Sequence, residues 1–120
     1  MDKAIVITTA GEIKIVDCPE DVSLKWMYIQ INCEWIEIVR PRRLKRGFVM
    51  IVDEEGLLKP NRLNYHGSYL YETDKHGQPI AGDVLILRET EGDDGVYCTG
   101  MSEIDADLIV AELTEQVVIV

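Results

Sequence analysis

The sequence predicts one α+β domain with a mixed, mainly antiparallel sheet of five or six short strands and two main helices. At 120 residues the chain has the usual length of a single domain. Its apolar fraction of 47% is that of a folded globular protein rather than a disordered chain. Short β-branched and apolar runs alternate with turn residues, and two segments carry helical signals. The domain is therefore expected to cover residues 1–120.

The chain opens with a predicted β-hairpin. Residues 4–9 and 13–16 are β-branched runs on either side of Gly11. Pro19 follows, with acidic residues beside it, and this pattern is typical of a helix start, because proline has no N–H to leave unpaired and acids favour the positive helix end.

A short helix and a strand are expected next. Four apolar residues recur at helical spacing and predict a helix that ends near Asn32, although alternation over 27–32 leaves a strand open as an alternative. Residues 34–39 alternate and predict a strand with Ile36 and Ile38 facing the core. The apolar positions of the helix are Leu24, Met27, Tyr28 and Ile31.

The second half contains two expected central strands. Residues 48–52 and 83–87 are continuously apolar, as in strands covered on both faces. Between them, residues 60–82 are predicted to form a long irregular stretch. After a turn, residues 96–99 are expected to return as a short strand.

A helix over 102–115 is the strongest helical prediction. Ser102 and Asp105 form a capping signal, and acids fill the first turns. Ile104, Leu108 and Ala111 are expected to form its apolar stripe. Residues 117–120 read as an edge strand or a contact with another chain, so a homodimer is left open.

The cysteines and the hydropathy pattern indicate a cytoplasmic protein. The three cysteines are widely spaced, form no C-x-x-C pair and are interpreted as buried thiols. The N-terminal apolar run is too short for a signal peptide, and no stretch approaches the ~20 residues of a membrane span. The expectation is therefore a cytoplasmic chain without a membrane partner.

The acidic charge is concentrated at one end of the chain. The net charge is −10, yet residues 89–120 contain nine acids and no lysine or arginine. Such asymmetry can mark an interaction surface or serve solubility. The candidate acidic contact surface comprises Asp93, Asp94, Asp105 and Asp107.

Motifs of common enzymes do not occur in the sequence. There is no phosphate-binding glycine loop, no dinucleotide fingerprint, no nucleophile elbow and no zinc-protease motif. With only two histidines, a metal site made of three histidines is impossible within one chain. The sequence therefore predicts no enzyme, no metal and no cofactor.

Five of the twelve basic residues fall within seven positions around Pro41. An arginine-rich loop can hold phosphates, since guanidinium groups match phosphate oxygens. It can equally neutralise the acidic C-terminal segment or keep a loop soluble. Direct nucleic-acid binding is disfavoured by the net charge. This candidate anion-binding loop comprises Arg40, Arg42, Arg43, Lys45 and Arg46.

A second candidate site lies at 61–69, where aromatic rings stand beside polar donors. Such a mixture suits a planar, polar ligand such as a nucleotide. The alternative is a surface segment that packs its rings on the sheet. The candidate residues are Asn61, Arg62, Tyr65, His66 and Tyr69.

The order of several short motifs resembles a known family. They are Lys3–Ile7, Trp35–Val39, Asp53–Gly56 with Pro60-Asn61, Ile80–Asp83 and Ser102–Asp105. Together they are similar to domain of unknown function 3846, a family of bacteria, their phages and mobile elements. The resemblance places Asn61 and Gly82 in recurring motifs but implies no activity or catalytic residue. Its setting implies a small accessory protein acting on host machinery.

Two functions of different classes follow as expectations. The first is a non-enzymatic phage or mobile-element accessory protein that binds a host protein or a nucleotide-type small ligand. The alternative is an acidic DNA-mimic inhibitor of a host nuclease or another DNA-binding defence protein. Mimicry predicts salt-sensitive binding to a basic protein, whereas ligand capture predicts thermal stabilisation by a small molecule.

Overall fold

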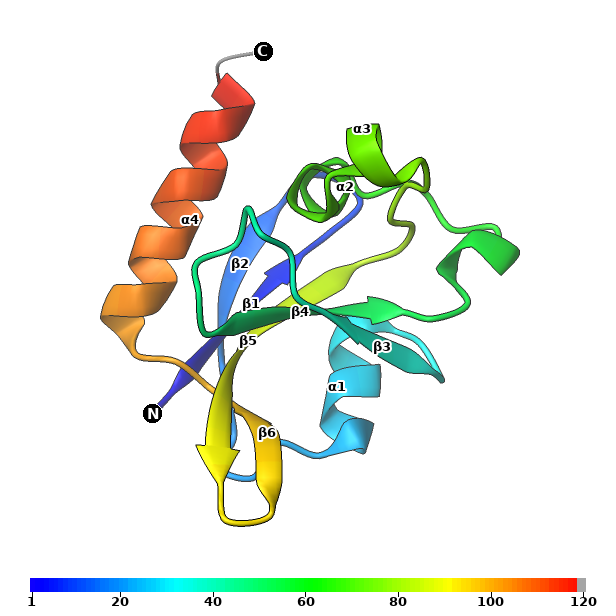
Figure 1. Cartoon of the computed structure of the whole chain (residues 1–120). Coiled ribbons are helices and arrows are strands. Elements are labelled where there is room, and N and C mark those ends of the chain that lie inside the picture. Colours follow the sequence, from blue (N-terminus) through cyan, green and yellow to red (C-terminus); the bar gives the residue numbers. More distant parts are fainter. Residues whose placement is uncertain (119–120) are drawn as a thin grey trace.

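One antiparallel sheet organises the chain (Figure 1). The computed structural model describes residues 1–118, with side chains described for residues 1–115. Five strands lie in the order β2-β1-β5-β4-β3, and β6 pairs with the far half of β5. The strands are β1 (Lys3–Ile7), β2 (Ile13–Asp17), β3 (Ile36–Val39), β4 (Phe48–Asp53), β5 (Val84–Gly92) and β6 (Gly95–Thr99).

The helices cover both faces of this sheet. Side chains that alternate along β1, β4 and β5 enter two separate cores, because successive residues of a strand point to opposite faces. One core packs against α2 and α4, and the other packs against α1. The helices are α1 (Leu24–Ile31), α2 (Tyr65–Tyr71), α3 (Thr73–His76) and α4 (Glu103–Val118), and a 3₁₀ turn, η1, spans Gly56–Leu58.

Polar side chains fix where the three longer helices begin. Ser23 accepts the Trp26 amide at α1, and the Ser102 hydroxyl accepts the Asp105 amide at α4. At α2 the buried Asn64 side chain accepts the Gly67 amide. Each cap satisfies an amide that has no partner inside the helix.

The predicted fold class is confirmed. The N-terminal hairpin, the strands over 48–52, 83–87 and 96–99, and the helix over 102–115 all occur. β4 is buried along its whole length, as the continuously apolar sequence predicts. The helix alternative for 24–31 is also correct, and Asn32 ends it in the left-handed conformation with φ 50°.

Three predictions in the first two thirds of the chain are wrong. Pro19 does not start a helix, because the Ser23 cap sets the start at Leu24. Ile38 does not reach the core but is 38% exposed, since it lies on the edge strand β3 and borders an open hollow beside Met27 of α1. Residues 60–82 are not irregular throughout, because they contain α2 and α3.

The C-terminal helix presents a different face from the predicted one. Ile104, Leu108 and Ala111 are exposed, and the buried positions are Ala106, Ile109 and Leu113. Residues 117 and 118 continue α4, so an edge strand there is wrong. Residues 119–120 lie outside the described part of the chain.

Candidate functional site

The basic loop, residues 40–46, connects β3 to β4 at one end of the sheet. Its backbone makes two tight turns, with the Leu44 amide donating to the Pro41 carbonyl and the Phe48 amide donating to the Lys45 carbonyl, both at 3.2 Å. The Leu44 side chain is buried in the core beneath α4. The loop is therefore anchored at its middle.

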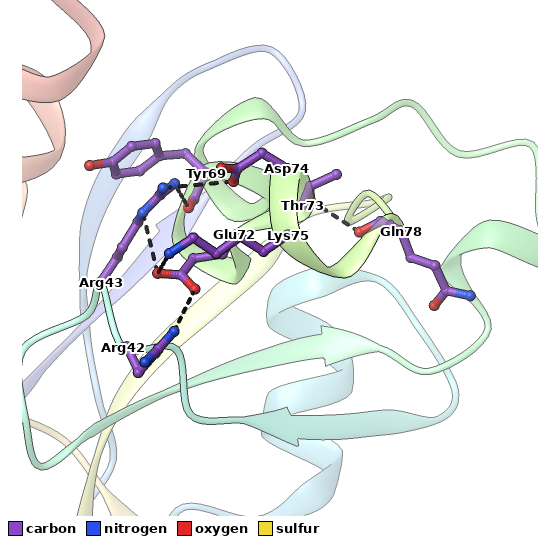
Figure 2. A network of polar contacts seen from close by, with 8 residues as sticks. All are labelled: Arg42, Arg43, Tyr69, Glu72, Thr73, Asp74, Lys75 and Gln78. Atoms are coloured by element: carbon purple, nitrogen blue, oxygen red, sulfur yellow. Dashed lines mark hydrogen bonds and ion pairs between the residues drawn. The ribbon is translucent and has the colours of Figure 1, made fainter.

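One flank of the basic loop is held by Glu72, the residue that ends α2 (Figure 2). Its carboxylate, which is 10% exposed, lies 3.5 Å from Arg42 Nη2, 3.6 Å from Arg43 Nε and 3.8 Å from Lys75 Nζ. Arg43 also donates to the Tyr69 carbonyl at 2.8 Å and lies over the Tyr69 ring. A poorly solvated carboxylate needs such partners, so the network fixes this flank.

The other flank is held by the acidic segment. Arg40 Nε donates to Glu89 Oε1 at 3.1 Å, and its Nη2 pairs with the second carboxylate oxygen. Lys45 Nζ lies 3.2 Å from Asp105 Oδ1. These hydrogen bonds lower the pKa of Glu89 and of Asp105. Two carboxylates of the acidic segment are thus neutralised by the basic loop.

The flanks enclose an open groove of about 520 Å³, called the basic groove below. Four cations and two carboxylates line it, and Glu72 and Asp105 pair with two of these cations from outside the lining. Within the side chains that the structure describes, no carboxylate lies within ion-pair distance of Arg46, and Arg42 is 80% exposed. The lining residues are Arg40, Pro41, Arg42, Leu44, Lys45, Arg46, Gly47, Phe48, Glu89, Glu91 and Val96.

The five residues of the predicted site at 61–69 do not face one common side in the structure. Tyr65 and Tyr69 share the outer side of α2 and are 80% and 38% exposed, whereas His66 faces inward. Burial lowers the pKa of the His66 imidazole. Asn61 and Arg62 precede the helix and are exposed. None of the five lines the basic groove, and Tyr69 alone touches the basic loop, through Arg43.

Instead, Asn64 is the polar centre of this region, although the sequence indicated it only as part of the segment. It is fully buried, and its Nδ2 donates to the carbonyls of Ile7 and Gly82, both at 3.0 Å. Its oxygen caps α2. An asparagine just before an apolar helical run is the signal that could have identified this cap.

Two of the motifs that carry the family resemblance, residues 53–61 and 80–83, meet beside Asn64. A Cβ on Gly56 would lie 2.6 Å from the Ala81 carbonyl oxygen, so only glycine fits there. Asn61 lies against Gly82, whose φ of +89° favours glycine. Asp53 is buried and accepts from Lys59 at 2.8 Å. These motifs therefore build a structural junction.

The predicted acidic contact residues lie on two elements. Asp93 and Asp94 form the exposed tip of the β5–β6 hairpin, and Asp105 and Asp107 lie on α4. Asp105 already has a partner in Lys45. Asp107 is exposed.

The three thiols lie in surroundings that disfavour the thiolate, and the possible metal ligands among the described residues are dispersed. Burial raises the pKa of Cys18 to about 11 and also raises the pKa of Cys33 and of Cys98, which keeps these thiols protonated at neutral pH. Among the described residues, no three His, Cys, Asp or Glu side chains are grouped to hold a metal ion. No helix in the described part of the chain is long and apolar enough to span a membrane.

The fold and the basic groove define a small α+β protein with one two-sided antiparallel sheet and a cationic loop at one end. Residues 1–109 match the family described as Domain of unknown function (DUF3846), and the chain belongs to that family. The resemblance expected from the short motifs is confirmed. No curated protein and no solved structure matches the chain.

Proposed function

We propose that this protein is a non-enzymatic accessory protein of a phage or mobile element that binds a nucleotide-type anion in the basic groove. The observation that carries the proposal is that this groove is lined by four cations of one anchored loop. Its volume is within the range of small-molecule sites. The phage or mobile-element setting is supported only by what the family resemblance implies. Host-protein binding is the other half of the proposal and concerns α4.

The ion pairs of the loop favour ligand capture because they hold Arg40, Arg42 and Lys45 in place before a ligand arrives. A guanidinium carries five N–H donors, and the contact between Arg42 and Glu72 uses few of them. Arg46 supplies a second guanidinium group at the groove. Preorganised donors lose less conformational entropy on binding. A phosphate-bearing ligand can therefore accept from Arg42 and Arg46 without displacing the carboxylates.

Thermal unfolding with a panel of mononucleotides, dinucleotides, cyclic nucleotides and inorganic pyrophosphate tests this proposal. A ligand at about a hundred times its Kd stabilises by about 2.7 kcal/mol. The double variant Arg42→Gln with Arg46→Gln should weaken binding at least tenfold, because charge-assisted hydrogen bonds contribute about 1.5–3 kcal/mol each. Calorimetry at two salt concentrations gives the affinities.

The double variant Arg62→Gln with Tyr65→Ala is the matched control, since both residues are exposed and lie outside the groove. It should bind like the parent chain. If it loses the ligand while the Arg42 and Arg46 variant retains it, the site is at 61–69 and the groove assignment is wrong. If no member of the panel stabilises the chain, the small-ligand proposal fails.

DNA mimicry is the second candidate, favoured by the exposed pair of aspartates at the hairpin tip. The triple change of Asp93, Asp94 and Asp107 to Asn leaves the Lys45–Asp105 pair intact. Inhibition of DNA cleavage by host nucleases, measured at low and high salt, tests the idea. Mimicry predicts inhibition that falls with salt and with the triple change. Inhibition that survives both would exclude mimicry.

A further inference from the structure

Helix α4 has two apolar faces, and only one is used by the fold. Ala106, Ile109 and Leu113 are buried against the sheet. On the opposite side lies the outer stripe, defined here as Ile104, Leu108 and Ala111, whose first two members are 73% and 50% exposed.

The spacing of the outer stripe is that of a helix-docking surface. Its residues are separated by four and three positions, so they follow one line along a helix of 3.6 residues per turn. Isolated exposed leucines are common on protein surfaces, whereas an aligned stripe at i, i+4 and i+7 is the pattern by which amphipathic helices meet a partner.

Acidic residues flank the outer stripe on both sides. At 100° per residue, Glu103 and Asp107 lie along one edge and Glu112 along the other, and all three are exposed. The chain contains no lysine or arginine beyond residue 88, so α4 itself supplies no cation. Lys45 pairs with Asp105 on the same edge as Glu112, and among the described side chains no cation lies within ion-pair distance of Glu103, Asp107 or Glu112.

We propose that the outer stripe of α4 binds a basic amphipathic helix of a partner protein, one with an apolar ridge flanked by lysines or arginines. Such a helix would cover Ile104 and Leu108 and place its cations beside Asp107 and Glu112. A second copy of the chain fits poorly, because two α4 helices would bring acids against acids. An anionic lipid surface meets the same repulsion. The inference specifies the protein-binding half of the proposed function and does not involve the basic groove.

Selection from a library of random 16-residue peptides displayed on phage, with the full chain as bait, tests the chemical class directly. The enriched peptides should carry apolar residues at i, i+4 and i+7 with flanking Lys or Arg. Titration of a synthetic enriched peptide into ¹⁵N-labelled protein should perturb amides of α4. The double variant Ile104→Gln with Leu108→Gln should weaken binding at least tenfold, because central apolar anchors dominate such interfaces.

Two further variants separate the contributions. Asp107→Asn with Glu112→Gln should weaken binding several-fold at low salt and have less effect at high salt. Leu57→Gln with Leu58→Gln is the matched control, because those leucines are equally exposed but lie on η1, far from α4 (Figure 1). This control should bind like the parent chain. Thermal unfolding of each variant confirms that the fold is kept.

Three outcomes overturn the inference. In the first, the selection enriches no peptide of the stated pattern. In the second, the enriched peptides bind the Ile104 and Leu108 variant as tightly as they bind the parent chain. Sedimentation can also show a dimer of the chain that this variant dissociates, which makes a second copy the occupant. The Arg42 and Arg46 variant should bind the peptide normally, so a failure of the basic groove and a failure of the α4 surface remain distinguishable.

Discussion

Asn64→Ala should destabilise the fold strongly although Asn64 lies in a connecting segment. The Asn64 side chain is fully buried and makes three hydrogen bonds to backbone groups of three different segments. Losing the cap of α2 costs about 1 kcal/mol. Leaving the carbonyls of Ile7 and Gly82 without this donor costs at least about 1 kcal/mol each. The sum is a loss of about 3 kcal/mol in the free energy of unfolding.

Urea denaturation followed by circular dichroism measures this loss, provided that the m-value is unchanged. Asn61→Ala is the matched control, because Asn61 is exposed and makes only a 3.5 Å contact with the Gly56 carbonyl. It should cost under about 1 kcal/mol. A loss below about 1 kcal/mol for Asn64→Ala would refute the assigned role.

Asn64→Asp separates capping from the donor role. Aspartate caps helices as well as asparagine does, so a role in capping alone predicts little change. The structure predicts a loss at least as large as that of Asn64→Ala, because a carboxylate would replace the amide donor that faces two carbonyl oxygens. A stable Asn64→Asp variant would show that the two donated bonds contribute little.

Three further predictions concern the core and the titrating groups. Leu85→Ala should lower the free energy of unfolding by about 2–4 kcal/mol, measured by urea denaturation, because Leu85 is fully buried in β5. A decrease of less than about 0.5 kcal/mol would place Leu85 at the surface. The lowered pKa of His66 means that stability is complete above its ordinary value of 6.5 and falls as the pH drops through 6.5 towards the folded-state pKa. His66→Gln should flatten that slope. The pKa of Asp105 is lowered, so the stabilisation by Lys45 is present above the ordinary aspartate pKa of 3.8 and is lost as the pH falls through the folded-state pKa. Lys45→Gln should therefore weaken the dependence of the unfolding temperature on acid pH.

Local sequence patterns predicted the strands and the helix start at Ser102 but not the orientation of α4. Ile104–Leu108–Ala111 and Ala106–Ile109–Leu113 have nearly the same helical spacing, so periodicity cannot choose between them. The choice depends on how the chain enters the helix. Met101 pairs with Lys3 of β1, and a Cβ on the preceding Gly100 would lie 2.6 Å from Asp2. This close approach fixes which side of α4 meets the sheet, and it comes from the other end of the chain.

The sequence did not predict helix α2 within residues 60–82 for a related reason. Gly67 weakens a helix by about 1 kcal/mol, so propensity disfavours α2. In the fold a Cβ on Gly67 would lie 3.2 Å from the Ile80 side chain, so the glycine allows the helix to pack closely. Residues 65–71 are helical because Asn64 and the contact with Ile80 outweigh the propensity, and Asn64 is itself held by the Ile7 carbonyl, 57 residues away in the sequence.

The charges of the basic loop show most clearly what the sequence alone could not give. Counting residues gives five cations in a chain of net charge −10, and that net charge disfavours the binding of polyanions. The carboxylates that pair with Arg42, Arg40 and Lys45 lie 30, 49 and 60 residues further along the chain, so only the fold shows which charges are consumed. Each pair neutralises one acid together with one cation and holds that cation at the groove. The acidity that disfavours polyanions at long range therefore also supplies the carboxylates that position Arg40 and Arg42 at the proposed anion site.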